Sequence, residues 1–123
     1  MLRRRLLAIA VLAFSVPPCI PQGNTTIQMR PVKAQRLAGI VTVGTDNTQP
    51  INGAHVEECD SGWHHVLAST MTDDNGRFHL TPTGKHPIHY IRIYAPGLNI
   101  SEYLVRLSRF APAELHLEIQ VGT

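Results

Sequence analysis

The sequence has little charge, few cysteines and no long apolar run. Of its 123 residues, 16% are charged and two are cysteine. The longest uninterrupted apolar run is Leu6–Phe14, which is shorter than the roughly 20 residues that a permanent membrane helix needs. Apolar residues make up 43% of the chain, which is enough for one hydrophobic core and leaves nothing for a second. The composition therefore predicts a single domain without a permanent membrane span.

The beginning of the chain has the pattern of a secretory signal peptide. Three arginines at positions 3 to 5 precede the apolar run, and two prolines at positions 17 and 18 follow it. A basic start, a short apolar centre and small residues at the end are typical of such signals. Ala13 and Ser15 are small and two positions apart, so we expect cleavage after Ser15. Residues 1–15 are then a signal peptide, and the protein is periplasmic or secreted.

Loss of this segment changes the charge balance. The whole chain has a formal net charge of +2, and removal of the three arginines brings it to −1. A nearly neutral chain has little electrostatic attraction for nucleic acid or for an acidic membrane surface. We therefore expect neither as a partner.

Export also gives a meaning to the two cysteines, Cys19 and Cys59. An oxidising compartment favours a disulfide between them if cleavage leaves Cys19 in the mature chain. Two other interpretations stay open: Cys59 is a single thiol while Cys19 lies in a flexible stub, or Cys19 carries a lipid anchor. Against the anchor, Pro18 occupies the position where lipoprotein signals normally have a small residue.

Residues 16–35 are rich in Pro, Thr and Gln and show no apolar period, which is typical of a flexible linker.

From Arg36 onward, apolar and polar residues alternate with a period of two between turn residues. Such segments at a spacing of about 8–12 residues are typical of a β-sandwich. Strands are expected at 37–43, 54–58, 65–71, 77–81, 90–95, 102–107 and 114–121. No helical period occurs outside the signal, so we predict an all-β domain over 36–123.

The acidic turn Asp73-Asp74-Asn75-Gly76 lies between two of these strands. Asp and Asn close such turns with their side chains, and Gly supplies a positive φ. A calcium loop needs oxygen ligands spread over a longer segment. We expect a structural role for this turn.

Four segments of the domain together match a known pattern. They are Gly39–Val41, Pro50–Val56, Thr72–Phe78 and Tyr90–Gly97. The series resembles the carboxypeptidase regulatory-like domain family, over about residues 36–121. The resemblance implies a transthyretin-like, seven-stranded, antiparallel or mixed Greek-key β-sandwich. It also implies a non-catalytic exported module, although turn and core motifs specify a fold better than an activity.

Two enzyme families share this sandwich. In intradiol ring-cleavage dioxygenases a His-x-His pair and two tyrosines hold a non-haem iron; His89 falls near the first histidine, but Ile91 occupies the second position. Transthyretin-like hydroxyisourate hydrolases end in a Tyr-Arg-Gly-Ser type motif, whereas this chain ends in Gln120–Thr123 without tyrosine or arginine. No Ser-containing Gly elbow and no Cys-His spacing indicates a nucleophile. We expect no enzymatic activity and no cofactor.

Seven histidines nevertheless raise a metal-dependent alternative. His64 and His65 are adjacent and would point to opposite faces of a strand, so they cannot chelate one ion as a regular strand pair. His86 and His89 flank Pro87, and they can share an iron or zinc ion if that loop folds back. His89 also has the phase of the apolar residues that follow it, which places it at the edge of the core. An unusual metal-dependent enzyme that uses His86 and His89 stays open as the alternative function.

The strand at 90–95 carries a stripe of large side chains that we expect to face outward. Tyr90, Arg92 and Tyr94 form this stripe, and Trp63 in an earlier loop can join it. Such side chains stack on sugar rings or on a partner's side chains. Cross-strand packing explains the same pattern without a ligand. We predict an exported non-catalytic module with a binding or structural role, whose partner is a protein or glycan at the cell envelope.

Overall fold

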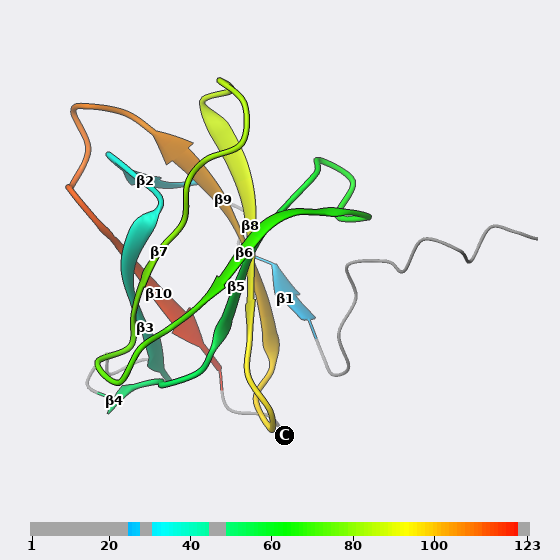
Figure 1. Cartoon of the computed structure of the whole chain (residues 1–123), viewed down its shortest axis with the longest axis vertical. Helices are drawn as coiled ribbons and strands as arrows, with labels where there is room; N and C mark the ends of the chain where they lie inside the picture. Colours follow the sequence, from blue (N-terminus) through cyan, green and yellow to red (C-terminus); the bar gives the residue numbers. More distant parts are fainter. Residues whose placement is uncertain (1–24, 28–30, 45–48, 121–123) are drawn as a thin grey trace, which may run out of the picture.

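The computed structural model describes residues 25–27, 31–44 and 49–120, which form ten β-strands and no helix (Figure 1). None of these residues therefore belongs to a helix with the length and apolarity of a membrane span. The expected signal peptide and its cleavage site lie outside the described residues.

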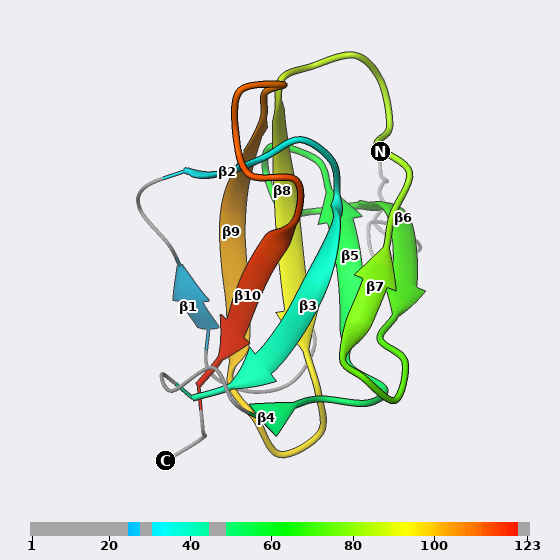
Figure 2. The ribbon, with the colours of Figure 1, turned by 90° about the vertical axis from the view of Figure 1, so that its left-hand side faces the viewer.

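The strands form two sheets that face each other (Figure 2). The larger sheet contains β1 (Thr25–Ile27), β2 (Val32–Ala34), β5 (His55–Cys59), β6 (Val66–Met71), β8 (Ile88–Tyr94) and β9 (Ile100–Leu107). The smaller sheet contains β3 (Ala38–Val43), β4 (Gln49–Pro50), β7 (Arg77–His79) and β10 (Leu115–Ile119).

Both sheets are mixed. The larger sheet has the order β1-β9-β8-β5-β6, and β2 also pairs with β9. Its central pairs are antiparallel, whereas β1 and β2 run parallel to β9. In the smaller sheet β3 runs parallel to β10 and antiparallel to β4 and β7. The expectation of an all-β, sandwich-like fold with mixed sheets is confirmed.

Each of the seven expected strands is present, as β3 and β5 to β10, with ends that differ by at most two residues.

The interpretation of 16–35 as a linker needs a correction, because β1 and β2 lie within it and pair with the edge of β9. Ala34 of β2 is fully buried. Each of these two strands has only three residues, which is too short to show a period of two, so the alternation could not reveal β1 or β2.

The core lies between the sheets and contains most of the apolar residues that the alternation assigns to the inner faces. Its members from the expected strands include Leu37, Val41, Ala54, Val56, Phe78, Leu80, Ile91, Ile93, Ala95, Leu115, Leu117 and Ile119. Gly39 also lies on an inner face, where a Cβ would overlap the Leu115 carbonyl group of β10. The close approach of β3 and β10 therefore requires glycine at this position.

One tyrosine connects the two sheets at the edge of β10. The Tyr103 hydroxyl, from β9, donates to the Glu118 carbonyl oxygen at 2.7 Å and accepts from the Glu118 N–H at 3.0 Å. Burial raises the pKa of Tyr103, so the hydroxyl keeps its proton. A single side chain thus satisfies both backbone groups of Glu118 on an edge strand.

The acidic turn between β6 and β7 has the expected structural role. The Asp73 carboxylate accepts from the N–H groups of Arg77 and Asn75, each at 2.9 Å. These two hydrogen bonds, that from Arg77 first, hold the pKa of Asp73 below its usual value. Gly76 follows with a φ of +75°, a conformation that favours glycine.

Candidate functional site

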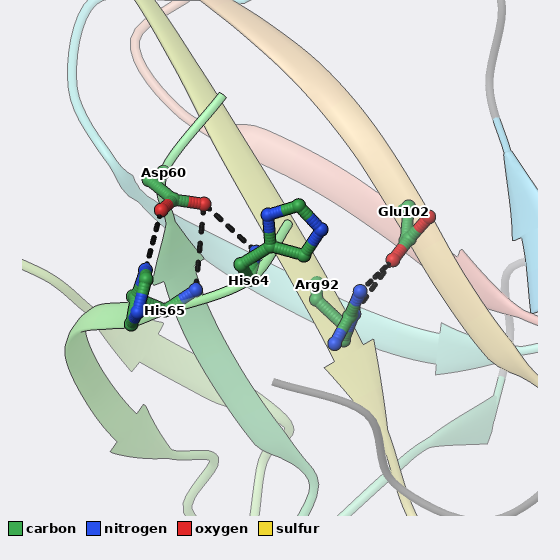
Figure 3. Close-up of polar contacts among 5 residues, drawn as sticks. All are labelled: Asp60, His64, His65, Arg92 and Glu102. Atoms are coloured by element: carbon green, nitrogen blue, oxygen red, sulfur yellow. Dashed lines mark hydrogen bonds and ion pairs between the residues drawn. The ribbon is translucent and has the colours of Figure 1, made fainter. Parts of the chain in front are cut away.

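The loop after β5, residues 60–65, folds around the side chain of Asp60. Its Oδ1 accepts from the N–H of His64 at 2.8 Å, and its Oδ2 lies 2.8 Å from the Nδ1 of His65 (Figure 3). The bond from the His65 side chain and that from the His64 backbone lower the pKa of Asp60 to about 2. The carboxylate therefore stays ionised near neutral pH and holds the loop closed.

This loop holds Trp63 in a backbone conformation that is rare for a residue with a side chain. Trp63 has a φ of +62°, and among the described residues it is the only non-glycine with a positive φ. Such a conformation costs about 1–2 kcal/mol. The N–H of Trp63 donates to the Asp60 carbonyl at 3.0 Å, and the N–H of Asp60 donates to the His65 carbonyl at 3.0 Å. The bonds of Asp60 thus offset the strain that places Trp63.

Trp63 contacts two residues of the stripe on β8. Its ring meets Tyr90 edge to face, with 5.5 Å between centroids and 86° between the planes. The guanidinium carbon of Arg92 lies 5.4 Å from the centre of the Trp63 ring, which is within the range of a cation–π interaction. The structure therefore brings together Trp63, Tyr90 and Arg92, which we call the aromatic cluster.

Tyr94, the fourth residue chosen from the sequence, makes its contacts with β5. Its ring stacks on His55 with 4.6 Å between centroids and 4° between the planes. Its hydroxyl donates to the Glu57 carboxylate at 3.0 Å. Tyr94 thus extends the aromatic surface along the same face of the sheet, and its ring lies in a cross-strand pair.

Arg92 lies on the outer face of β8, as expected, but its side chain is buried there instead of exposed. Only 5% of Arg92 is exposed, and its Nε donates to the Glu102 carboxylate on β9 at 2.7 Å, as does its Nη2 (Figure 3). The alternation assigned the correct face, but it could not show that Glu102 faces Arg92 across the β8–β9 pair. Neither could it show that Trp63 lies against the guanidinium. Within the cluster, Arg92 lies beneath the Trp63 ring and supports it.

A cleft of about 490 Å³ adjoins the aromatic cluster. It lies where β5 ends and β8 begins, and Tyr90 lines it as well as contacting Trp63. Its other lining residues include Glu58, Cys59, Leu67, His86 and His89. The cleft and the cluster therefore form neighbouring parts of one surface.

Two buried titratable residues line this cleft. The side chains of His89 and Glu58 are 2% and 3% exposed, and His89 Nδ1 lies 2.6 Å from Glu58 Oε2. The other Glu58 oxygen accepts from the Thr83 N–H at 2.9 Å. A carboxylate placed in this way orients an imidazole and leaves its second nitrogen for a ligand or a proton.

The position of His89 at the edge of the core, expected from its phase, is confirmed. Glu58 is not among the candidate residues that the sequence pattern predicts. A signal was present, because Glu58 of β5 has the same phase as Val56 of this strand and as Ala54, which directly precedes it, and both of these face the core. A glutamate at an inward position near the end of a strand indicates a buried polar contact.

His86 and His89 line the same cleft, as the metal-dependent alternative requires. However, no group of three His, Cys, Asp or Glu side chains within the described ranges is placed to hold a metal ion. Structural and catalytic zinc sites use three or four protein ligands. The described residues therefore do not supply a complete site for iron or zinc.

Cys59 is 1% exposed and lines the cleft. Cys19 lies outside the described residues. The disulfide between the two cysteines stays a prediction, as do the alternatives to it.

No protein-family model matches this chain, and a search of curated proteins gives no match either. The resemblance to carboxypeptidase regulatory-like domains thus rests on the sequence motifs alone.

Proposed function

We propose that the protein is an exported, non-catalytic module that binds a protein or glycan at the cell envelope. Its fold is a transthyretin-like β-sandwich with Greek-key connectivity, as the resemblance to carboxypeptidase regulatory-like domains implies. The binding surface consists of Trp63 and Tyr90 of the aromatic cluster together with Tyr94. Arg92 positions these rings and makes no direct contact with the partner.

The conformation of Trp63 is the observation that carries this proposal. A strained backbone persists where the surrounding structure enforces it, and such residues cluster at functional sites. Here the bond from the His64 N–H to the Asp60 carboxylate and two backbone–backbone hydrogen bonds maintain a φ of +62° at an aromatic residue. Packing alone does not require this arrangement, because Trp63 is only half-buried.

The three aromatic side chains suit recognition of a sugar ring or a partner's side chain. Trp63, Tyr90 and Tyr94 are all half-buried, so part of each ring is held by the sheet and part is available. Tyrosine and tryptophan have two side-chain torsions each and lose little entropy when they bind. A rigid sheet beneath them lowers the ordering cost further.

A binding assay with matched aromatic variants tests the proposal. The purified exported protein is applied to a glycan array and used in a pull-down of envelope proteins. We expect Trp63→Ala and Tyr90→Ala to weaken binding at least about tenfold, as loss of an aromatic anchor typically does. Phe110→Ala is the control, because Phe110 is 87% exposed and belongs to the turn before β10. If both cluster variants bind as the wild type does, the proposal is wrong.

The second candidate is a metal-dependent enzyme that uses His86 and His89. The shared cleft and the orientation of His89 by Glu58 favour it, whereas the missing third ligand among the described residues does not. Metal analysis of the purified protein separates the two candidates. Stoichiometric iron or zinc that is lost in His89→Ala would replace the binding proposal, and a wild type without bound metal would eliminate this candidate.

A further inference from the structure

The two sheets protect their edges unequally. The edge of β9 is covered by β1 and β2. On the free side of β10, the Tyr103 hydroxyl and the Asn99 N–H bond to backbone groups of Glu118 and Gln120. The strands beside β3 are β4, which contains Pro50, and β7, which contains a charged arginine. Short strands, proline and charge are the usual means of preventing edge-to-edge pairing.

The strand β6 lacks most of these protections. It forms the far edge of the larger sheet and pairs, among the described strands, only with β5 (Figure 2). It is six residues long and contains no charge and no proline. A single bulge interrupts its pairing with β5 near the start, opposite Glu58 and Cys59.

Exposed apolar side chains are concentrated on the same strand. Four large hydrophobic residues of the described chain are exposed, and three of them belong to β6: Val66 at 44%, Leu67 at 47% and Met71 at 52%. An exposed apolar edge with unpaired backbone groups is a template for another strand. These residues therefore lie where a partner strand would cover them.

We propose that β6 pairs with β6 of a second copy of this chain, so that the two larger sheets join into one. A second copy suits this edge because β6 is uncharged, and two copies placed side by side bring no like charges together. An isologous contact of this kind closes on itself and needs a single surface. This proposal does not rest on the proposed binding function.

The two-fold axis determines the register of the pair. In an antiparallel pair, residues that lie opposite each other point to the same side of the sheet. In a symmetric pair of β6 strands, one residue must therefore lie opposite its own copy, and the two-fold axis passes beside this residue. If that residue is Ser69, Met71 of each copy lies opposite Leu67 of the other. The two most exposed apolar side chains of β6 then cover one another.

A lysine on the axis tests the pairing. Ser69 is exposed and faces Glu57 across the β5–β6 pair, so Ser69→Lys is compatible with the monomer fold, which circular dichroism verifies. Sedimentation velocity is measured from about 1 μM to about 1 mM, because a contact of one strand pair is small and weak. We expect the wild type to dimerise within this range and Ser69→Lys to dimerise at least tenfold more weakly.

Two further samples test whether a loss of dimerisation is specific to the charge at position 69 of β6. Thr81→Lys, which adds the same charge at an exposed position outside β6, is expected to dimerise as the wild type does. An equimolar mixture of Ser69→Lys and Ser69→Glu is expected to regain association, because opposite charges then meet at the axis. A wild type that remains monomeric throughout, or a Ser69→Lys variant that dimerises as well as the wild type, would overturn the proposal.

Discussion

Tyr103 brings a hydroxyl group into the space between two sheets, where a polar group without a partner costs about 1–3 kcal/mol. The hydroxyl both donates to and accepts from the backbone of Glu118. It therefore stabilises the edge of β10 and attaches this edge to β9. Tyr90 of β8 provides a comparison for the hydroxyl group, because the contact of Tyr90 with Trp63 is made by its ring.

The change Tyr103→Phe is expected to lower the free energy of unfolding by about 1–3 kcal/mol, because it leaves two backbone groups of Glu118 without their partner. Urea unfolding measures the difference. Tyr90→Phe is the control and should change stability by less than about 0.5 kcal/mol. Equal stability of the two variants would show that the Tyr103 hydroxyl does not hold the edge.

Glu58 and His89 form a buried side-chain pair that contributes to the stability of the fold. Each is almost fully buried, and each would lose its side-chain partner if the other were replaced, although Glu58 would keep its bond from the Thr83 N–H. Removing one member of such a pair leaves a buried polar group without compensation, whereas removing both does not.

We therefore expect Glu58→Leu alone to destabilise the fold by about 3–5 kcal/mol. The double variant Glu58→Leu with His89→Leu should lose clearly less than the sum of the two single variants. Denaturant unfolding of all four proteins gives the coupling energy directly. Strict additivity would mean that the two side chains do not depend on each other.

At the scale of the element, the loop 60–65 depends on one ionised carboxylate. The folded pKa of Asp60, about 2, lies below the ordinary value of 3.8. Ionised Asp60 therefore favours the closed loop at pH values above about 4. This contribution is lost as the pH falls from about 4 through 2.

The chain contains a single tryptophan, so the fluorescence of Trp63 reports on this loop. We expect its emission to shift to longer wavelength as the pH falls from about 4 toward 2, because protonation of Asp60 releases the loop. Asp60→Ala should show the shifted emission already at neutral pH. Asp74→Ala alters an exposed carboxylate in another turn and should behave as the wild type does; an unshifted Asp60→Ala would show that the carboxylate does not hold Trp63.

The state of the two cysteines depends on the export that the sequence predicts. If the expected signal peptide is cleaved after Ser15, both Cys19 and Cys59 remain in the mature chain. Cys59 is almost completely buried, so a disulfide with Cys19 would attach the start of the mature chain near the cleft.

Intact mass spectrometry of the exported protein tests both expectations. We expect a chain that begins at Val16 and is two hydrogens lighter than its reduced form, because an oxidising compartment favours the disulfide. Titration under denaturing conditions should then find no reactive thiol. Two reactive thiols per chain would exclude the disulfide, and an added lipid mass would support an anchor on Cys19.

Much of the fold could be predicted, because strand positions and their inner faces follow from the local period of two and from turn residues. Only three short strands, β1, β2 and β4, escaped notice. The candidate site was predicted in part: the pattern placed Tyr90 and Tyr94 on one face and proposed Trp63 beside them. It could not reveal the burial of Arg92, because that depends on Glu102 of β9 and on the loop around Asp60.

Alternation and turn chemistry act over a few neighbouring residues, so the amino-acid sequence was sufficient to predict the all-β class, the seven main strands and the inward phase of His89. The tertiary structure alone decided that Glu58 binds His89, that Arg92 lies beneath Trp63 and that β6 is left as an exposed apolar edge. These features depend on which strands become neighbours and in which register. Residues that are distant in sequence meet only after the sheets have formed.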